Sequence, residues 1–417
     1  MKITISSPDG LGDFVMRTPL LRALLDNGHR LQLFMRRPAA DLAREIFPET
    51  DIQIIGQDPY HSAIKRRMHP FRSEHQAIRK FQPDLYVAAL FHLNFFDQVW
   101  LEHGRPRTKV VGFSTGEAFR PSETTCDPEE LTRQFDRVVE VAVDLPEIEK
   151  YQRLTSAILE REVVLGRPVL TPTAQALSQA RELLARHGLE EGKFWVSCVG
   201  TRPGLLMKDW GEENWAAFFR QALQGHKIAF VGNTKEWASI ERIRHDMPDS
   251  VNLADNPPEV SVSSALCSLS AGYVGRDSGI MHLTAAVGRP VFAIFGAGHW
   301  GRFLPAAEKG VVVAQDWPCR GSNFHCPHEE PYCIRDVPME LALKGWQMLQ
   351  AGEIQGLKVL EAPLDQSLLS QIARTASLQY ARLAQESRRR ELAKCRPKNL
   401  LDAIGLKIRS WAGGGTS

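Results

Sequence analysis

The sequence lacks several features that would each assign it to a class of proteins. Lys and Arg total 51 against 49 Asp and Glu, a formal charge of +2, so nucleic acid is not expected to be the main partner. Residues 1–14 contain no apolar core of signal-peptide length, and no window reaches the roughly 18 apolar residues of a membrane-spanning helix. The protein is therefore expected to be soluble and cytoplasmic.

Cysteine is also scarce. An odd total of seven in a long chain is typical of thiols in a reducing compartment and not of a disulfide framework. Cys319, Cys326 and Cys333 have six residues between neighbours, with His325 and His328 nearby. Structural zinc sites use gaps of about two to four residues, so loop thiols and no bound metal are expected, with a metal knuckle as the alternative.

Short apolar or β-branched runs alternate with segments of helical period. In the first half, strands are expected at 2–6, 30–34, 51–55, 84–90 and 108–113, and helices at 13–26, 39–46 and 95–103. In the second half, strands are expected at 193–199, 226–232, 250–254, 271–275 and 289–296, and helices at 212–224, 235–246, 259–269 and 280–287. This alternation predicts two α/β halves, each with a parallel sheet covered on both faces.

The joint between the halves is expected in the proline-containing stretch 165–175. We predict an N-terminal domain at 1–168, a C-terminal domain at 169–351 and a helical, basic tail at 352–417. A ligand cleft would then lie between the domains, facing the carboxyl ends of their strands.

The tail is predicted to be helical over 365–411, with a break at Pro397. A solvated tail is the simpler interpretation; an anchor on anionic lipid or an oligomer contact are the alternatives. The alternatives depend on a basic cluster and on apolar residues at helical spacing. The basic residues are Arg388, Arg389, Arg390, Lys394, Arg396 and Lys398, and the apolar ones are Leu400, Leu401, Ile404, Ile408 and Trp411.

The stretch GRDSGIMHLTAAVGRPVFAIFG, residues 275–296, is the most informative part of the chain. Asp277, Ser278 and Gly279 follow a buried strand and precede a helix, where free backbone N–H groups and the helix dipole favour a phosphate. Ser278 is expected to cap the helix and donate to a phosphate oxygen, and His282 to meet a diphosphate. Asp277 would instead accept from sugar hydroxyls. Each residue alone has an ordinary structural explanation, but together they favour a nucleotide-sugar site.

This stretch resembles the signature of glycosyltransferase family 9, the ADP-heptose:lipopolysaccharide heptosyltransferases. GLGDFVMRTPLLRALLDNG, DLYVAAL with RTKVVGF, MKDWGEENW and FVGNTKE resemble further segments of that family in the same order, over roughly residues 1–350. The resemblance implies a GT-B architecture, in which two Rossmann-like domains face each other across a cleft. It implies an inverting transfer that needs no metal or other cofactor, with the donor in the C-terminal half and the acceptor in the N-terminal half.

An inverting transfer needs a base that takes the proton of the acceptor hydroxyl. Asp13, after the first strand, matches the family's catalytic aspartate; capping of its own helix is the alternative role, and Asp97 is the second candidate base. The resemblance also assigns Lys208 to the departing diphosphate, as a cation placed where charge develops. Thr201 and Arg202 are weaker candidates for the same site.

Other residues are expected to bind donor or acceptor. Glu236 is expected to hold ribose hydroxyls, and Trp300 and Arg302 to contact base or sugar. The acceptor would lie near Gly12 and a basic stretch, residues 60–80, whose charge suits an acidic acceptor such as a lipopolysaccharide inner core. An exposed helix with a charged face explains that stretch equally well. Its candidate acceptor ligands are Lys65, Arg66 and Arg67.

The sequence therefore favours a glycosyltransferase that moves a sugar, with heptose from ADP-heptose the leading donor, to a lipopolysaccharide core, another surface glycan or a protein. Such an enzyme would act in the cytoplasm, with peripheral contact at the inner face of the inner membrane through the tail. A nucleotide-sugar epimerase or hydrolase on the same scaffold is one alternative, because a fold does not fix chemistry. A glycan-binding or scaffold protein without activity is the other.

Overall fold

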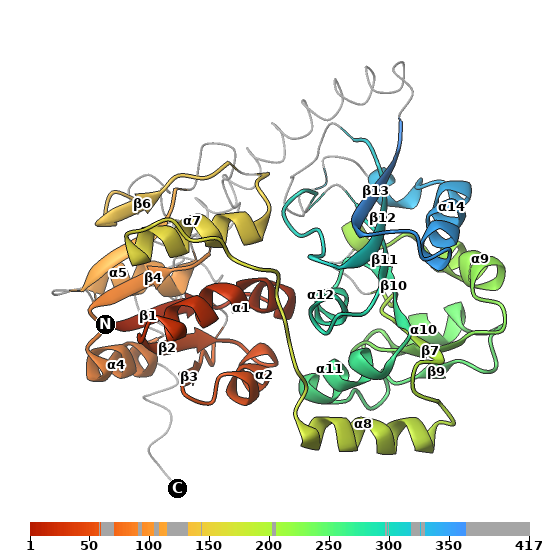
Figure 1. Ribbon diagram of the computed structural model, residues 1–417, viewed down its shortest axis with the longest axis horizontal. Coiled ribbons are helices and arrows are strands. Elements are labelled where there is room, and N and C mark those ends of the chain that lie inside the picture. The colour runs from red at the N-terminus through yellow and green to blue at the C-terminus, as the bar shows by residue number, and fades with distance from the viewer. Residues whose placement is uncertain are drawn as a thin grey trace, which may run out of the picture.

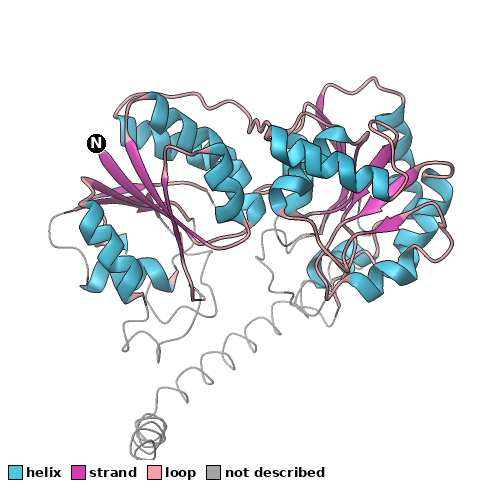
Figure 2. Cartoon of the chain, turned by 90° about the horizontal axis from the view of Figure 1, so that it is seen from below, coloured by secondary structure: helices cyan, strands magenta, loops and turns pink. Residues whose placement is uncertain are grey.

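The computed structural model describes most of residues 1–363. The described positions are 1–57, 59, 71–90, 94–103, 108–114, 132–142, 144–201, 206–296, 298, 300–317, 326 and 330–363. Two α/β units lie side by side, and Figures 1 and 2 show a twisted sheet between helices in each. No helix within these ranges is long and apolar enough to cross a membrane.

The N-terminal sheet has six strands in the order β3-β2-β1-β4-β5-β6, and every pair is parallel. Strand order reverses beside β1, because β2 and β3 lie on one side of it and β4 to β6 on the other. Ligands bind at such reversal points in open parallel sheets, at the carboxyl ends of the strands. The strands are β1 (Lys2–Ser7), β2 (Arg30–Met35), β3 (Asp51–Ile54), β4 (Leu85–Ala88), β5 (Lys109–Phe113) and β6 (Arg137–Val139).

The C-terminal sheet has seven parallel strands in the order β13-β12-β11-β10-β7-β8-β9. Its order reverses between β7 and β10, so the loops after these two strands flank the corresponding reversal point. The strands are β7 (Phe194–Ser197), β8 (Lys227–Phe230), β9 (Val251–Asn252), β10 (Gly272–Arg276), β11 (Val291–Ile294), β12 (Lys309–Gln315) and β13 (Gly356–Ala362).

The predicted start of a helical tail at residue 352 is wrong. Residues 356–362 form β13, which pairs in parallel with the whole of β12, from Lys309 opposite Gly356 to Gln315 opposite Ala362. This edge strand carries only a weak local pattern, because most of its side chains are exposed or half-buried and its partner lies far away in the sequence. The segment 365–411 lies outside the described residues.

Helices cover both faces of each sheet, as the sequence predicts. In the N-terminal domain, α1 (Leu11–Asp26), α2 (Ala39–Ile46) and α7 (Glu147–Leu159) pack on one face, and α4 (Arg72–Phe81) and α5 (Phe95–His103) on the other. In the C-terminal domain, α8 (Ala174–Arg186), α11 (Val260–Leu269) and α12 (Gly279–Ala286) pack on one face. The other face carries α9 (Glu212–Ala222), α10 (Trp237–Ile243) and α14 (Met339–Gln350), with α13 (Tyr332–Arg335) and the 3-10 helix η1 (Leu206–Lys208) nearby.

The two domains share one hydrophobic cluster. It runs from α1, α2 and α7 of the first domain to α8, α11 and α12 of the second, and α1 packs on α12 while α2 packs on α11. Residues 160–173 contain no regular element and descend between the domains from α7 to α8 (Figure 1). The carboxyl ends of β1 and β10 are thus brought together at the contact between α1 and α12.

Candidate active site

The site lies where the first turns of α1 and α12 meet. A Cβ atom at Gly12 would lie 2.8 Å from Cδ2 of His282, and one at Gly279 would lie 3.0 Å from Cβ of Leu11. Glycine is needed at both positions because a side chain would force the helices apart. Both helices point their N-termini, with free N–H groups and partial positive charge, toward this contact.

Replacing Gly12 by alanine is therefore expected to destabilise the protein by about 1–3 kcal/mol through overpacking, although alanine is the better helix former. Chemical denaturation of the full chain measures this change. Gly56→Ala is the matched control, because a Cβ there has nothing within 4 Å and the backbone is not left-handed. Equal stability of the two variants would show that α1 and α12 do not pack as described.

Ser278 caps α12, as the sequence predicts. Its Oγ accepts a hydrogen bond from the backbone N–H of Met281 at 3.2 Å and lies 3.0 Å from the hydroxyl of Tyr273. Tyr273 also donates to the carbonyl of Arg276 at 2.6 Å, so one hydroxyl contacts both the end of β10 and the cap of α12. The cap holds the first turn of α12 in a fixed orientation for a ligand.

Lys208 and Asp277 form an ion pair beside this cap. Nζ of Lys208 lies 2.7 Å from Oδ2 of Asp277, and the side chains are 17% and 7% exposed. The lysine ends η1, which a buried tryptophan anchors: Nε1 of Trp210 donates to the carbonyl of Val337 at 3.0 Å. A Cβ at Gly296 would lie 2.4 Å from the carbonyl of Met207, so this glycine lets η1 approach the end of β11. The motif's glycine after β11 therefore helps to place the lysine.

Asp13 lies in the first turn of α1 and is partly exposed. Its Oδ2 accepts from the backbone N–H of Gly10 at 3.2 Å, so the capping role weighed in the sequence is present. The carboxyl is nevertheless packed within the protein, and this loss of hydration, followed by the charge of Asp9, raises the pKa of Asp13 to about 7, although the charge of Arg17 opposes the rise. A carboxyl with a pKa near 7 is suited to accept a proton near neutral pH.

A buried arginine next to Asp13 was not singled out in the sequence. The side chain of Arg17 is fully buried and forms an ion pair with Asp9, also donating to Ser7. Its Nη2 donates to the hydroxyl of Tyr151 on α7 at 2.7 Å. The only sequence signal is an arginine one helical turn after Asp13, on the same face. This cluster fixes the loop between β1 and α1, from which Asp13 projects.

Glu236 does not lie free to bind a ribose. Its Oε1 accepts from Nη2 of Arg276 at 2.7 Å, and its Oε2 accepts from the backbone and side-chain nitrogens of Asn233 at 2.9 and 2.8 Å. Both charged side chains are 5% exposed. The pair ties the end of β10 to the start of α10, because a buried arginine needs a nearby carboxylate.

Arg302 and Asp97 also have structural partners in place of the expected ones. Arg302 is 3% exposed and forms an ion pair with Glu147, so it does not face a base or sugar. Asp97 is fully buried and accepts from the hydroxyl of Tyr86 and from Asn94, both at 2.6 Å. Burial raises the pKa of Asp97 to about 6, but the carboxyl has no contact with solvent and cannot take a proton from an acceptor. The second candidate base is therefore wrong.

Thr201 and Trp300 lie near the predicted cleft. Thr201 follows β7 at the reversal point, and among the described residues its buried hydroxyl has no hydrogen-bond partner. The ring of Trp300 lies 6.2 Å from that of Phe295, at the end of β11. Several predicted residues lie outside the described ranges: Lys65, Arg66, Arg67, Arg202, Cys319, His325 and His328.

The expected loop thiols are placed only in part. Cys326 and Cys333 are free cysteines, the latter buried. Among the positions that the structure describes, no group of three or more His, Cys, Asp or Glu residues could hold a metal ion. A metal knuckle that includes Cys319 falls outside those positions.

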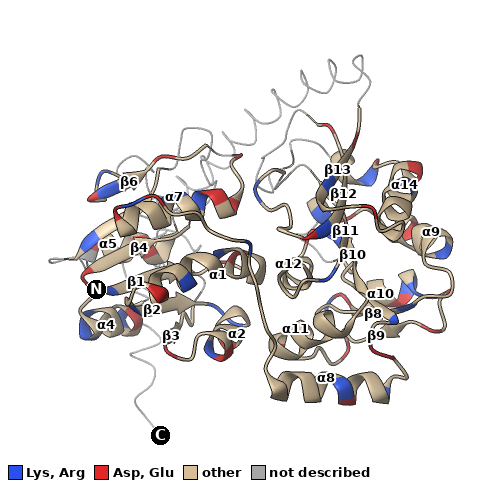
Figure 3. Ribbon diagram, in the orientation of Figure 1, with Lys and Arg blue, Asp and Glu red and all other residues tan. Residues whose placement is uncertain are grey.

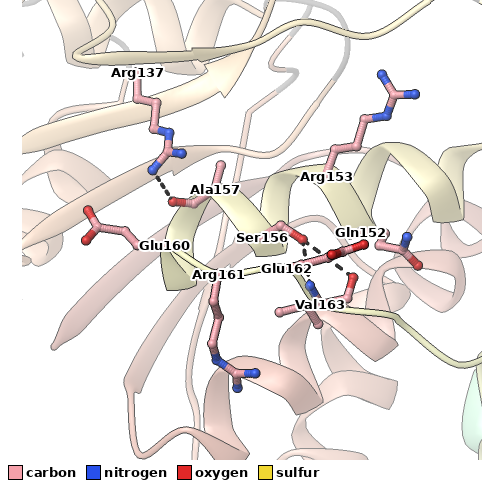
Figure 4. Close-up of a pocket in the computed structure, with 9 residues that line it drawn as sticks. All are labelled: Arg137, Gln152, Arg153, Ser156, Ala157, Glu160, Arg161, Glu162 and Val163. Carbon is pink, nitrogen blue, oxygen red and sulfur yellow. Dashed lines mark hydrogen bonds between the residues drawn. The ribbon is translucent and has the colours of Figure 1, made fainter.

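A cavity of about 640 Å³ lies elsewhere, at the C-terminal end of α7 (Figure 4). Three arginines and two glutamates line it, so its charges do not select a ligand of one sign. Arg137 donates to the carbonyl of Ala157, another lining residue, at 2.6 Å. The lining residues are Arg137, Gln152, Arg153, Ser156, Ala157, Glu160, Arg161, Glu162 and Val163.

The model of glycosyltransferase family 9 (heptosyltransferase) matches residues 125–330. The matched segment, just under half of the chain, is similar to this family. It includes Lys208 and the 277–282 cluster but not Asp13. The resemblance seen in the sequence is thereby confirmed.

Individual relatives agree with the family match. Lipooligosaccharide heptosyltransferase 2 of Haemophilus influenzae is 28% identical over 177 residues, which are 39% of this chain and 51% of that protein. The chain thus spans about half the length of this curated relative.

Solved structures share the fold. The Escherichia coli ADP-heptose LPS heptosyltransferase II is 18% identical with a TM-score of 0.61, over 85% of this chain and 99% of that one. A glycosyl transferase family 9 structure from Veillonella parvula is 15% identical with a TM-score of 0.67, over 84% and 98%. The predicted GT-B architecture is confirmed.

Proposed function

We propose that the protein is an inverting glycosyltransferase that moves heptose from ADP-heptose to a hydroxyl of a lipopolysaccharide core, another surface glycan or a protein. One observation carries the proposal: Asp13 and the Lys208–Asp277 pair lie on different domains, at the loops that α1 and α12 bring together. The E. coli relative is named for ADP-heptose and LPS, which supports this donor and acceptor.

An inverting transfer needs a base and a leaving-group site on opposite sides of the anomeric carbon. The acceptor oxygen attacks the anomeric carbon from the face opposite the departing diphosphate, and the oxygen's proton must go to a base. Asp13 of the N-terminal domain supplies that base. Lys208, with the cap of Ser278 and the first turn of α12, supplies positive charge for the diphosphate on the C-terminal side.

Other residues complete the proposed donor site. The buried hydroxyl of Thr201 forms a hydrogen bond with the nucleotide-sugar, since it has no hydrogen-bond partner among the described residues. Asp277 orients Lys208, and its carboxylate also accepts a hydrogen bond from a sugar hydroxyl. His282 lies beside Gly12 at the contact between the domains. Glu236 acts through Arg276 on the loop that carries Asp277.

The acceptor is proposed to approach from the N-terminal domain, near Gly12 and the basic residues Lys65, Arg66 and Arg67. An acidic glycolipid acceptor would place the enzyme in the cytoplasm, at the inner face of the inner membrane. Contact of residues 365–411 with a membrane, or with a second copy of the chain, stays a prediction.

Lys208 and the helix N-terminus provide the charge that a metal ion would otherwise supply, so we propose a metal-independent reaction. ADP without metal is expected to raise the melting temperature, because a ligand at 100 times its Kd adds about 2.7 kcal/mol of stability. Thermal shifts with ADP, UDP, GDP and CDP, each with and without EDTA, measure this. A shift that needs a divalent ion would refute metal independence, and selectivity for another base would replace the donor.

A further inference from the structure

A buried ion pair joins the two domains at the start of α7. Nε of Arg302 donates to Oε1 of Glu147 at 2.8 Å, and the side chains are 3% and 2% exposed. The backbone N–H of Glu147 also donates to the carbonyl of Arg302 at 3.0 Å. Lys150, fully buried, lies 2.9 Å from the same carboxylate oxygen. Figure 3 shows acidic positions at the end of α7 that faces the C-terminal domain.

Stability alone does not explain such a pair. Removing two charges from water is costly, and a buried pair often adds no more stability than apolar side chains of the same size. Burial opposes ionisation of Glu147, but the charges of Arg302 and Lys150 outweigh it and hold the pKa of Glu147 below its usual value. The carboxylate therefore stays charged, and the contact stays ionic, at neutral pH.

The loop that carries Arg302 leads directly to the candidate site. The guanidinium of Arg302 lies 5.1 Å from the ring centre of Phe303, and that ring lies 6.3 Å from the ring of His282. His282 in turn packs against Gly12, next to Asp13. A continuous line of contacts thus runs from the ion pair to the first turn of α1.

The charges of the pair also act on Asp13, with opposite signs. Glu147 raises the pKa of Asp13 and Arg302 lowers it. The titratable and charged groups around Asp13 come from three helices and two loops. They are Asp9 and Arg17 on the β1–α1 loop and α1, Glu147, Lys150 and Tyr151 on α7, Arg302 on the loop after β11, and His282 on α12.

We propose that Glu147 and Arg302 are positioning residues that hold the two domains closed around Asp13 and balance the charge at its carboxyl. The proposal rests on the proposed function only for the role of Asp13 as base; the ion pair and the closure do not depend on it. The sequence predicted contact of Arg302 with the base or sugar of the donor. In this proposal it acts instead on the carboxyl of Asp13.

The decisive experiment titrates the Asp13 carboxyl by ¹³C NMR in the full chain, with its signal assigned from Asp13→Asn. Arg302→Met removes a positive charge and is expected to raise the pKa of Asp13 by about one unit. Glu147→Gln removes a negative charge and is expected to lower it by a similar amount. In Glu147→Gln/Arg302→Met the two opposite effects cancel, so the pKa of Asp13 is expected to lie near that of the wild type. Because Lys150 pairs with the same carboxylate, a triple variant that adds Lys150→Met leaves no charge of this cluster unpaired and is the variant to use if the others do not fold.

Small-angle scattering of the same proteins without ligand tests closure. Both single variants are expected to have a larger radius of gyration than the wild type. Arg302→Lys keeps the positive charge, so its radius of gyration is expected to lie between those of the wild type and Arg302→Met. Arg167→Met is the matched control, because Arg167 pairs with Glu308 between the connecting stretch and the C-terminal domain at partly exposed positions. Its radius of gyration is expected to be unchanged.

Shifts of the Asp13 pKa in the same direction for both single variants, or no shift, would overturn the proposal. An unchanged radius of gyration in both would overturn it as well. Opposite shifts in a protein that transfers no sugar would support the proposal and count against the role of Asp13 as base, so the two failures are distinguishable.

Discussion

Asp13→Asn lowers kcat by about 10²- to 10⁴-fold, the usual contribution of a positioned general base. Asparagine can still accept the hydrogen bond from the backbone N–H of Gly10, so the start of α1 stays folded. The change removes only the capacity to take a proton. The Kd for ADP, measured by calorimetry, is expected to stay within about twofold of the wild type, because the donor charge is met on the other domain.

The pH dependence of the wild type follows from the same carboxyl. With a pKa of about 7, Asp13 is protonated below neutral pH, so kcat/KM rises through pH 7 and levels off above it. The pKa of Asp13 is about 7 in the folded protein and 3.8 in the unfolded one. Between pH 3.8 and 7 the folded protein therefore binds a proton that the unfolded chain has released, and the folded protein loses stability as pH rises through this range. Asp13→Asn therefore raises the melting temperature at pH 8, and the gain disappears toward pH 4.

Asp26→Asn is the matched control, because Asp26 is an exposed carboxylate at the other end of α1. It is expected to leave kcat, the pH profile and ADP binding unchanged. A wild-type rate for Asp13→Asn, or a pH profile that is flat in the wild type, would remove Asp13 from the mechanism. The capping role would then be its whole function.

Lys208→Met lowers kcat by about 10²- to 10³-fold, comparable to the loss of one preorganised donor at developing charge. The side chain is only 17% exposed and is oriented by Asp277, so it acts in partly desolvated surroundings. Methionine keeps the length of the side chain and removes the charge. Donor affinity falls as well, because the carboxylate of Asp277 then faces the diphosphate without its lysine.

Two further variants separate these effects. Lys344→Met, at an exposed position of α14, is the matched control and is expected to leave kcat unchanged. Lys208→Met/Asp277→Asn is expected to regain part of the donor affinity but not the rate, because the repulsion is gone while the cation is still missing. Full recovery of kcat in the double variant would show that Lys208 serves only to neutralise Asp277.

The sequence predicted the strands and helices around the site well, for a physical reason. Parallel strands buried on both faces appear as short apolar runs, and β7, β8, β10 and β11 each lie within such a run. The start of α12 was also predictable, because Ser278 caps it and Gly279 leaves room for Leu11. Strand β13 was missed because its partner β12 lies more than 40 residues away and most of its side chains are exposed or half-buried, so it has no apolar run.

Partners of the charged residues could not be predicted. Glu236 pairs with Arg276 across 40 positions, and Arg302 with Glu147 across 155. Nothing local in a sequence distinguishes a glutamate that binds a ribose from one that binds a buried arginine. Arg17 was missed for the same reason, since its partners come from both the β1–α1 loop and α7. The roles of Asp13 and Lys208 stay predictions.

Acceptor-dependent transfer from ADP-heptose tests the central claim most directly. The wild type and Asp13→Asn would be incubated with ADP-heptose, with and without a heptose-deficient lipopolysaccharide core, in EDTA, and the products measured by mass spectrometry. The account predicts a core that gains one heptose with the wild type only, and no donor consumption without the core. Conversion of ADP-heptose without any acceptor, or equal transfer by Asp13→Asn, would contradict it.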